Sequence, residues 1–279
     1  MPEPNKVRLH RLPYREIRGI ASFEGFHEYL FTNALDTYRD RVGGAGLGSV
    51  LAVCGGAREV RYLRRYPFDQ ITVSGIFERG DWFEESAEGD ERVAYRRENC
   101  ESLSFPTASH DLVFCKEGLH HLARPVLGLY EMLRVCRKAA IFIEPYESPL
   151  ERLFEKVGVA TKFERKQSSF QVLPTGSVVT RDNYVYHWTV RQLRTLLNSY
   201  YLDSGYELEL HLGWIVKRIG KRSRKLMELV AASGSAATFV PGARGNIVTA
   251  LVFPGASAPE QPVSFQAEGA QAPSASDHV

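Results

Sequence analysis

Residues 49–59 read Ser49-Val-Leu-Ala-Val-Cys-Gly-Gly-Ala-Arg-Glu59, a short apolar strand followed by a glycine loop and the start of a helix. A second stretch has the same organisation, and it reads Ser109-His-Asp-Leu-Val-Phe-Cys-Lys-Glu-Gly-Leu-His-His-Leu122. The glycines of the first loop allow the backbone to approach a ligand closely. Ligands of parallel sheets bind at the carboxyl ends of the strands. Both stretches therefore predict a ligand site at one edge of such a sheet.

The chain around these stretches alternates strand and helix patterns. The expected strands are Val50–Val53, Gln70–Ile76, Arg92–Arg96, Asp111–Cys115, Ala139–Ile143, Tyr206–Leu212 and Asn246–Phe253. The expected helices are Ser22–Arg41, Glu59–Tyr66, Pro125–Cys136, Glu151–Val157, Thr189–Leu197 and Trp214–Ala232. Strands that are apolar on both faces and alternate with helices predict a Rossmann-like α/β fold, in which helices cover both faces of a mostly parallel sheet.

Three regions are expected along the chain. Residues 1–46 form an N-terminal helical cap, which a glycine-rich connector over residues 43–48 joins to the main domain. Residues 47–253 form that domain, with residues 146–187 as a lid or substrate segment. Residues 254–279 are rich in Pro, Ala, Ser and Gln, so we expect a disordered tail.

The composition is that of an ordinary globular protein. Hydrophobic residues make up 44% of the 279 residues and charged residues 24%, and the formal net charge is +2. No basic run is interleaved with aromatic residues, and no apolar stretch is long enough to span a bilayer. The four cysteines form no CxxC pair and show no metal-ligand spacing with histidine. We expect a cytoplasmic protein with no nucleic-acid partner, no membrane contact and no metal site.

The ordered motifs over about residues 49–150 resemble the class I S-adenosylmethionine-dependent methyltransferase superfamily, and especially its small-molecule enzymes of natural-product and polysaccharide pathways. The matching segments are Cys54-Gly-Gly56, Ile71-Thr-Val-Ser-Gly-Ile76, Asn99-Cys-Glu-Ser-Leu-Ser-Phe-Pro106, Asp111-Leu-Val-Phe114, Leu119-His-His-Leu122 and Ile141-Phe-Ile-Glu-Pro145. The resemblance implies a seven-stranded sheet with an antiparallel last strand. It also implies S-adenosylmethionine as the cofactor and methyl transfer as the reaction.

The resemblance implies a set of cofactor-binding residues: Cys54, Gly55, Gly56, Arg58, Gly75, Ile76, Asn99, Cys100, Glu101 and Lys116. Two positions depart from the family pattern. Arg58 stands where the last glycine of the first loop is usual, and it either obstructs the cofactor or clamps its carboxylate. Ser74-Gly75 stands where an acid usually binds the ribose, a contact of about 1.5–3 kcal/mol per hydrogen bond. Glu78 or Asp81 could reach the ribose instead.

Three residues are candidates for catalysis. His187 lies among aromatic residues in the segment that should cover the pocket, so it is a candidate base or a member of a packed lid. His121 opens the helix after the fourth strand of the resemblance, where a structural role is the alternative. Glu144 ends the fifth strand and could orient a substrate hydroxyl.

The sequence leaves more than one function open. The first is methyl transfer to an oxygen or nitrogen atom of a small molecule, such as a natural product or a sugar. The second keeps the fold but replaces methyl transfer with another biosynthetic step, such as cyclisation, elimination or hydrolysis; the third is a binding partner without catalysis. Aromatic residues in the N-terminal segment and in residues 146–187 could also pack against a second subunit, which would make a homodimer.

Overall fold

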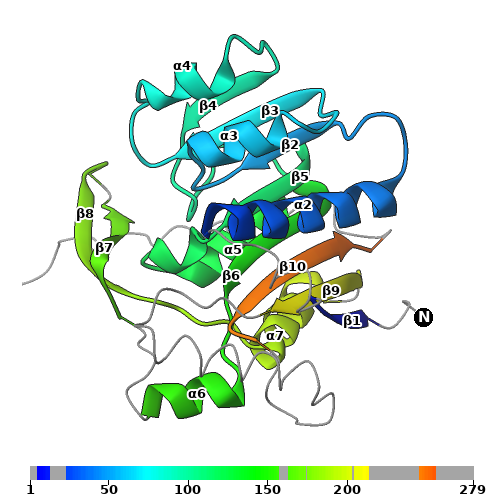
Figure 1. Ribbon diagram of the computed structural model, residues 1–279, viewed down its shortest axis with the longest axis vertical. Helices are drawn as coiled ribbons and strands as arrows, with labels where there is room; N and C mark the ends of the chain where they lie inside the picture. The colour runs from blue at the N-terminus through cyan, green and yellow to red at the C-terminus, as the bar shows by residue number, and fades with distance from the viewer. Residues whose placement is uncertain are drawn as a thin grey trace, which may run out of the picture.

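The computed structural model describes residues 5–12, 23–156, 163–173, 175–202, 204–213 and 245–255. Their central feature is an eight-stranded sheet with the strand order β1-β9-β10-β6-β5-β2-β3-β4 (Figure 1). In that order the strands are β1 Lys6–Arg11, β9 Tyr206–Gly213, β10 Ile247–Pro254, β6 Cys136–Pro145, β5 His110–Lys116, β2 Ser49–Ala52, β3 Gln70–Gly75 and β4 Val93–Arg97.

The directions of these strands confirm the predicted topology. β10 runs antiparallel to both β6 and β9. The pairs β1–β9, β2–β3, β2–β5, β3–β4 and β5–β6 are all parallel. The strand count is eight rather than the expected seven, because Lys6–Arg11 adds an edge strand beside β9. This strand carries four basic or histidine side chains and only two apolar ones, so its sequence did not resemble the buried strands.

Helices cover both faces of the sheet, as expected (Figure 1). On one face, α2 (Phe23–Val42), α3 (Ala57–Leu63) and α4 (Trp82–Ala87) share a buried apolar core with the sheet. On the other face, α5 (Pro125–Val135) and α7 (Val190–Tyr201) form a second core. α6 (Pro149–Lys156) lies beyond the carboxyl end of β6. None of the described helices is long and apolar enough to cross a membrane.

The start of α7 is set by a capping box. Thr189 Oγ1 accepts a hydrogen bond from the backbone N–H of Gln192 at 3.1 Å. The Gln192 side chain accepts one in return from the backbone N–H of Thr189 at 3.0 Å. Two N–H groups that would otherwise lack a helical partner are thereby satisfied.

A hairpin outside the main sheet was not predicted. β7 (Phe163–Val172) pairs antiparallel with β8 (Val178–Tyr184), and the two form a sheet of their own. The hairpin is anchored at the loop after β5, where Phe170 bridges to Leu122. The polar sequence of β7 hides the strand pattern, because few apolar residues alternate along it. The expected helix Trp214–Ala232 and most of the expected tail lie outside the described residues.

The N-terminal part of the chain contributes both β1 and α2 to the main sheet and its core. The connector before β2 uses left-handed glycines, with a φ of 65° at Gly43 and 69° at Gly48. A Cβ at Gly48 would lie 2.1 Å from a carboxylate oxygen of Asp111, so only glycine fits there. The connector therefore sets the position of β2.

Candidate functional site

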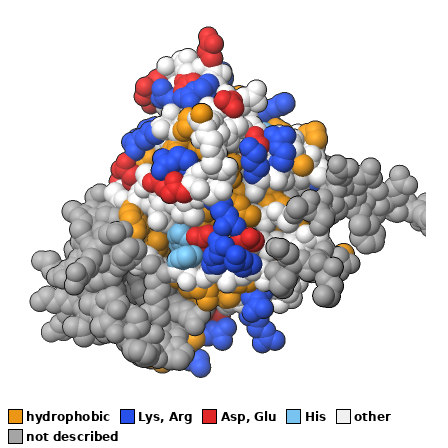
Figure 2. Space-filling view, turned by 90° about the vertical axis from the view of Figure 1, so that its right-hand side faces the viewer, with side chains coloured by type: hydrophobic (Ala, Val, Ile, Leu, Met, Phe, Trp, Pro, Cys, Tyr) orange, Lys and Arg blue, Asp and Glu red, His pale blue; other side chains and the backbone are white. Residues whose placement is uncertain are grey.

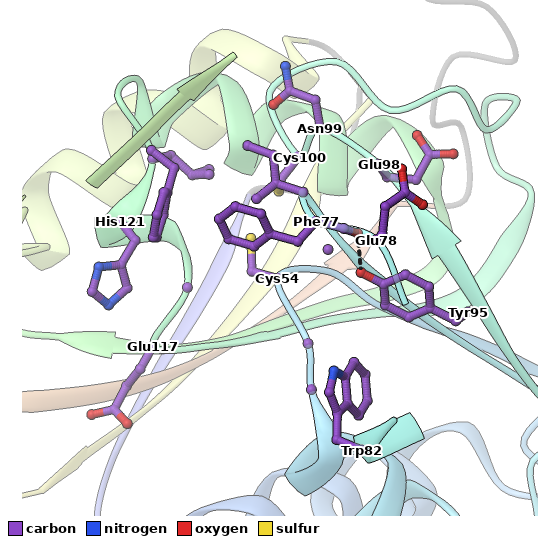
Figure 3. Close-up of a pocket in the computed structure, with 17 residues that line it drawn as sticks. Cys54, Phe77, Glu78, Trp82, Tyr95, Glu98, Asn99, Cys100, Glu117 and His121 are labelled. Carbon is purple, nitrogen blue, oxygen red and sulfur yellow. Dashed lines mark hydrogen bonds between the residues drawn. The ribbon is translucent and has the colours of Figure 1, made fainter. Parts of the chain in front are cut away.

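A cavity of about 620 Å³ lies at the carboxyl ends of β2, β3 and β5 (Figure 3). It is lined by Cys54, Gly55, Gly56, Gly75, Ile76, Phe77, Glu78, Trp82, Tyr95, Glu98, Asn99, Cys100, Glu117, Gly118, His121, Leu122 and Phe170. Both stretches that decided the fold contribute to its wall, as the sequence predicts. The hairpin contributes Phe170, whose ring lies edge-on to the ring of Phe77, with a centroid separation of 5.3 Å.

The loop after β2 is held by close backbone contacts. Cys54 adopts a left-handed φ of 53°, which is uncommon for a residue other than glycine. The N–H of Gly55 donates to the carbonyl of Ser74 at 2.9 Å, and a Cβ at Gly55 would lie 2.8 Å from Val73. The N–H of Gly56 donates to Glu59 at 2.7 Å. Gly55 is therefore required for packing against β3, while the Gly56 N–H already donates to the Glu59 carboxylate at the start of α3.

The end of β3, where the resemblance expects an acid, is occupied by Gly75 and packs against Tyr95. A Cβ at Gly75 would lie 2.9 Å from the hydroxyl of Tyr95. That hydroxyl donates to the carbonyl of Phe77 at 2.8 Å, the contact drawn as a dashed line in Figure 3. Glu78 also lines the cavity, and its carboxylate pairs with Arg97 at 2.6 Å. Asp81 instead precedes α4 and is not a lining residue.

The loop after β5 is organised by one fully buried carboxylate, that of Glu144. It accepts hydrogen bonds from the backbone N–H groups of Gly118 at 2.9 Å and Leu119 at 2.8 Å. Its second oxygen lies 2.7 Å from Nδ1 of His120. Glu144 lies behind the cavity wall rather than in it. Its carboxylate therefore supports the loop and does not face a ligand in the cavity.

Three of the four cysteines, Cys54, Cys100 and Cys115, gather at this wall. A Cβ at Gly118 would lie 2.5 Å from the Cβ of Cys54 and 2.9 Å from the sulfur of Cys115. Hydrogen bonds from the thiols of Cys100 and Cys115 lower the pKa of Cys54. Cys54 is half-buried and lines the cavity, whereas Cys115 is fully buried. The small side chains allow the two loops to approach each other closely.

The two candidate histidines occupy different places. His121 lines the cavity, and its Nδ1 lies 3.1 Å from the side-chain nitrogen of Asn183 on β8. His187 is not a lining residue, and its Nδ1 lies 2.9 Å from the carbonyl of Val185. The structure therefore places His121, and not His187, in the same cavity as the loop after β2.

Three residues of the expected cofactor set point elsewhere. Arg58 pairs with Glu24 of α2 at 3.4 Å, which places its guanidinium away from the cavity wall. Glu101 accepts two hydrogen bonds from Arg124. Lys116 is buried and pairs with Glu117 at 2.6 Å. The other expected cofactor residues, which are Cys54, Gly55, Gly56, Gly75, Ile76, Asn99 and Cys100, do line the cavity.

The sequence interpretation missed most of the aromatic wall. Phe77 lies two residues after the end of β3, and Trp82 is the first residue of α4, so the segment between these two elements could have been assigned to the cavity from the sequence. Tyr95 lies on the neighbouring strand, and Phe170 comes from the unpredicted hairpin. Their contribution depends on how distant elements pack, which one sequence does not reveal.

A buried histidine beneath the site predicts acid sensitivity. His27 on α2 lies 3.5 Å from the carboxylate of Glu117, and burial and the charge of Lys116 lower its pKa to about 4. The unfolded chain binds this proton near pH 6.5. The free energy of unfolding is therefore unaffected by His27 above pH 6.5. As the pH falls toward 4, protonation of His27 in the unfolded chain lowers this free energy by about 3 kcal/mol. Urea unfolding at several pH values should show a smaller loss in His27→Gln than in the parent chain.

Comparison with known proteins agrees with this geometry. A family model described as "Methyltransferase domain" matches residues 51–143. The fold is similar to that of a chain in the complex between the Haloferax volcanii Trm112 methyltransferase activator and a methyltransferase, with 11% identity, coverage of 83% of this chain and 93% of that chain, and a TM-score of 0.51. It is also similar to magnesium protoporphyrin IX methyltransferase from Synechocystis PCC 6803 with bound SAH, with 12% identity, coverage of 87% and 94%, and a TM-score of 0.50. A search of curated proteins finds no match.

Proposed function

We propose that this chain, a member of the class I S-adenosylmethionine-dependent methyltransferase superfamily by its domain match and its fold, transfers a methyl group to an oxygen or nitrogen atom of a small molecule. The observation that carries the proposal is the cavity, because seven of the ten residues that the sequence assigns to the cofactor line one space. Substrates of this class bind in such concave, partly apolar sites. A natural product or a sugar remains our preferred substrate class.

The charge and shape of the cavity support the proposed cofactor. S-adenosylmethionine carries a net positive charge, since its sulfonium and ammonium groups outnumber its carboxylate. The described lining residues include Glu78, Glu98 and Glu117 but no lysine or arginine. Asn99 and Cys100 line the part of the wall that would face the adenine, and Glu78 would reach the ribose in place of the missing acid.

The chain's own residues would orient the reactants and exclude water. When bound, the cofactor supplies an electrophilic methyl group, and catalysis then depends mainly on alignment of the acceptor. Phe77 and Phe170 close the cavity on the side of the hairpin, so we assign residues 146–187 to substrate binding. His121 is the candidate histidine that lines the cavity, and the side-chain nitrogen of Asn183 donates to its Nδ1 and orients the ring. The ring proton is then on Nε2, so His121 would orient the acceptor by donating a hydrogen bond to it.

Calorimetric titration of the full chain with S-adenosylmethionine and S-adenosylhomocysteine tests this proposal. We expect both to bind at micromolar concentrations, and we expect Glu78→Gln to weaken binding by about tenfold, because a charged hydrogen bond is lost. His187→Gln is the matched control, since this residue lies outside the cavity. An absence of binding at millimolar concentrations would rule out methyl transfer and would favour another reaction in the same cavity.

A further inference from the structure

Two histidines and one carboxylate lie close together on β1 and β9, at the edge of the sheet opposite β4. His10 on β1 and His211 on β9 are neighbours in the register of the parallel pair. Nε2 of His10 lies 3.3 Å from Oε1 of Glu209, and Nε2 of His211 lies 2.9 Å from the same oxygen. Each of the three residues offers one ligand atom, and these atoms all lie within 4.8 Å of one another. Figure 2 shows histidine side chains beside acidic and basic ones on the side of the molecule where β1 lies.

One tautomer of His211 would leave its Nε2 available for an ion. Its Nδ1 lies 2.8 Å from the side-chain oxygen of Asn33 on α2, and its Nε2 faces the carboxylate of Glu209. A neutral imidazole has one N–H, so it can donate to only one of these oxygens. If Nδ1 donates to Asn33, the lone pair on Nε2 faces the oxygen of Glu209. A cation between the two groups would remove that repulsion, and the contact to Asn33 resembles the outer hydrogen bond of many metal-binding histidines.

The three residues differ in their exposure to solvent. His10 is exposed, Glu209 is partly buried and His211 is buried, so an ion has a route in from the sheet edge. The buried hydroxyl of Thr249, the register partner of His211 on β10, has no hydrogen-bond partner among the described residues. Arg8 lies 3.9 Å from the other oxygen of Glu209, which leaves Oε1 for an ion but lowers the affinity through charge repulsion.

We propose that His10, Glu209 and His211 bind a divalent transition-metal ion of the zinc type, at a site separate from the cavity. Two imidazoles and a carboxylate are ligands that Zn²⁺ accepts, with a further position left for water. The sequence alone gave no hint of this site, because its ligands come from strands near opposite ends of the chain. The ion would join edge strand β1 to β9, so we assign it a stabilising role.

Metal binding is tested on the full chain without a histidine tag, after treatment with a chelator. We expect one Zn²⁺ per chain by calorimetry, and visible absorption bands when Co²⁺ is added instead. His10→Ala should weaken binding by at least about tenfold. This variant should fold normally because His10 is exposed. Cys54→Ser is the matched control for the thiol cluster and should bind as the parent does. Unchanged binding in His10→Ala, or no binding at millimolar Zn²⁺, would overturn the proposal.

A second measurement separates a structural ion from surface binding. An ion that binds only the folded state raises its stability by mass action. Saturating Zn²⁺ should therefore raise the melting temperature of the parent chain but not that of His10→Ala. Equal shifts in both proteins would show adventitious binding and would contradict the site.

Discussion

Glu144→Ala is expected to lower the free energy of unfolding by about 3–5 kcal/mol, the largest loss that we expect from a single substitution. The alanine would leave the buried N–H groups of Gly118 and Leu119 without an acceptor and would remove the partner of His120. Each such orphaned group costs about 1–3 kcal/mol when it is buried. Urea unfolding followed by circular dichroism measures the difference.

Two further variants make this prediction specific. Glu144→Gln keeps one acceptor oxygen for the two N–H groups, so its loss should stay below about 2 kcal/mol. Glu84→Ala removes a carboxylate from an exposed ion pair with Arg79 and should change stability by no more than about 0.5 kcal/mol. A Glu144→Ala loss as small as that of Glu84→Ala would show that the loop after β5 does not depend on the buried carboxylate.

The sequence predicted the centre of the fold because its local signals agree with the packing. β2 is apolar after Ser49 and β5 is apolar over its central residues 112–115, and each strand leads into a loop and a helix. The edge strand β1 and the hairpin were missed for the opposite reason. Their side chains are mostly polar, so partners from distant parts of the chain, and not their own pattern, decide that they are strands.

The same distinction applies to the site. Glycines next to strand ends, such as Gly55 and Gly75, could be assigned to the cavity from their position alone. The direction of a long side chain could not. Arg58 follows the same loop but pairs with Glu24 on α2, and Glu144 ends its strand but faces the backbone of the next loop. Partners on other elements determine where such side chains point.

Gly75→Asp combined with Tyr95→Phe is expected to tighten binding of S-adenosylhomocysteine by about 10- to 150-fold. The prediction rests on the proposed function. The aspartate would supply a second charged acceptor for the ribose besides Glu78, at the position where the resemblance expects an acid. The tyrosine must change as well, because a Cβ at position 75 lies 2.9 Å from its hydroxyl but 3.9 Å from the ring carbon that bears it. Phenylalanine removes the close contact and leaves the ring in ordinary contact.

The single variants and an uncharged analogue test the physical reason for this gain. Gly75→Asp alone should gain less, since the side chain would push the Tyr95 hydroxyl off the Phe77 carbonyl. Gly75→Asn with Tyr95→Phe has the same shape without the charge and should gain less than about tenfold. Equal affinity in the aspartate and asparagine proteins would contradict a ribose contact at position 75. The cavity would then have to hold the ribose through Glu78, on the far side of Phe77 in sequence, and loss of binding in Glu78→Gln would become the decisive measurement.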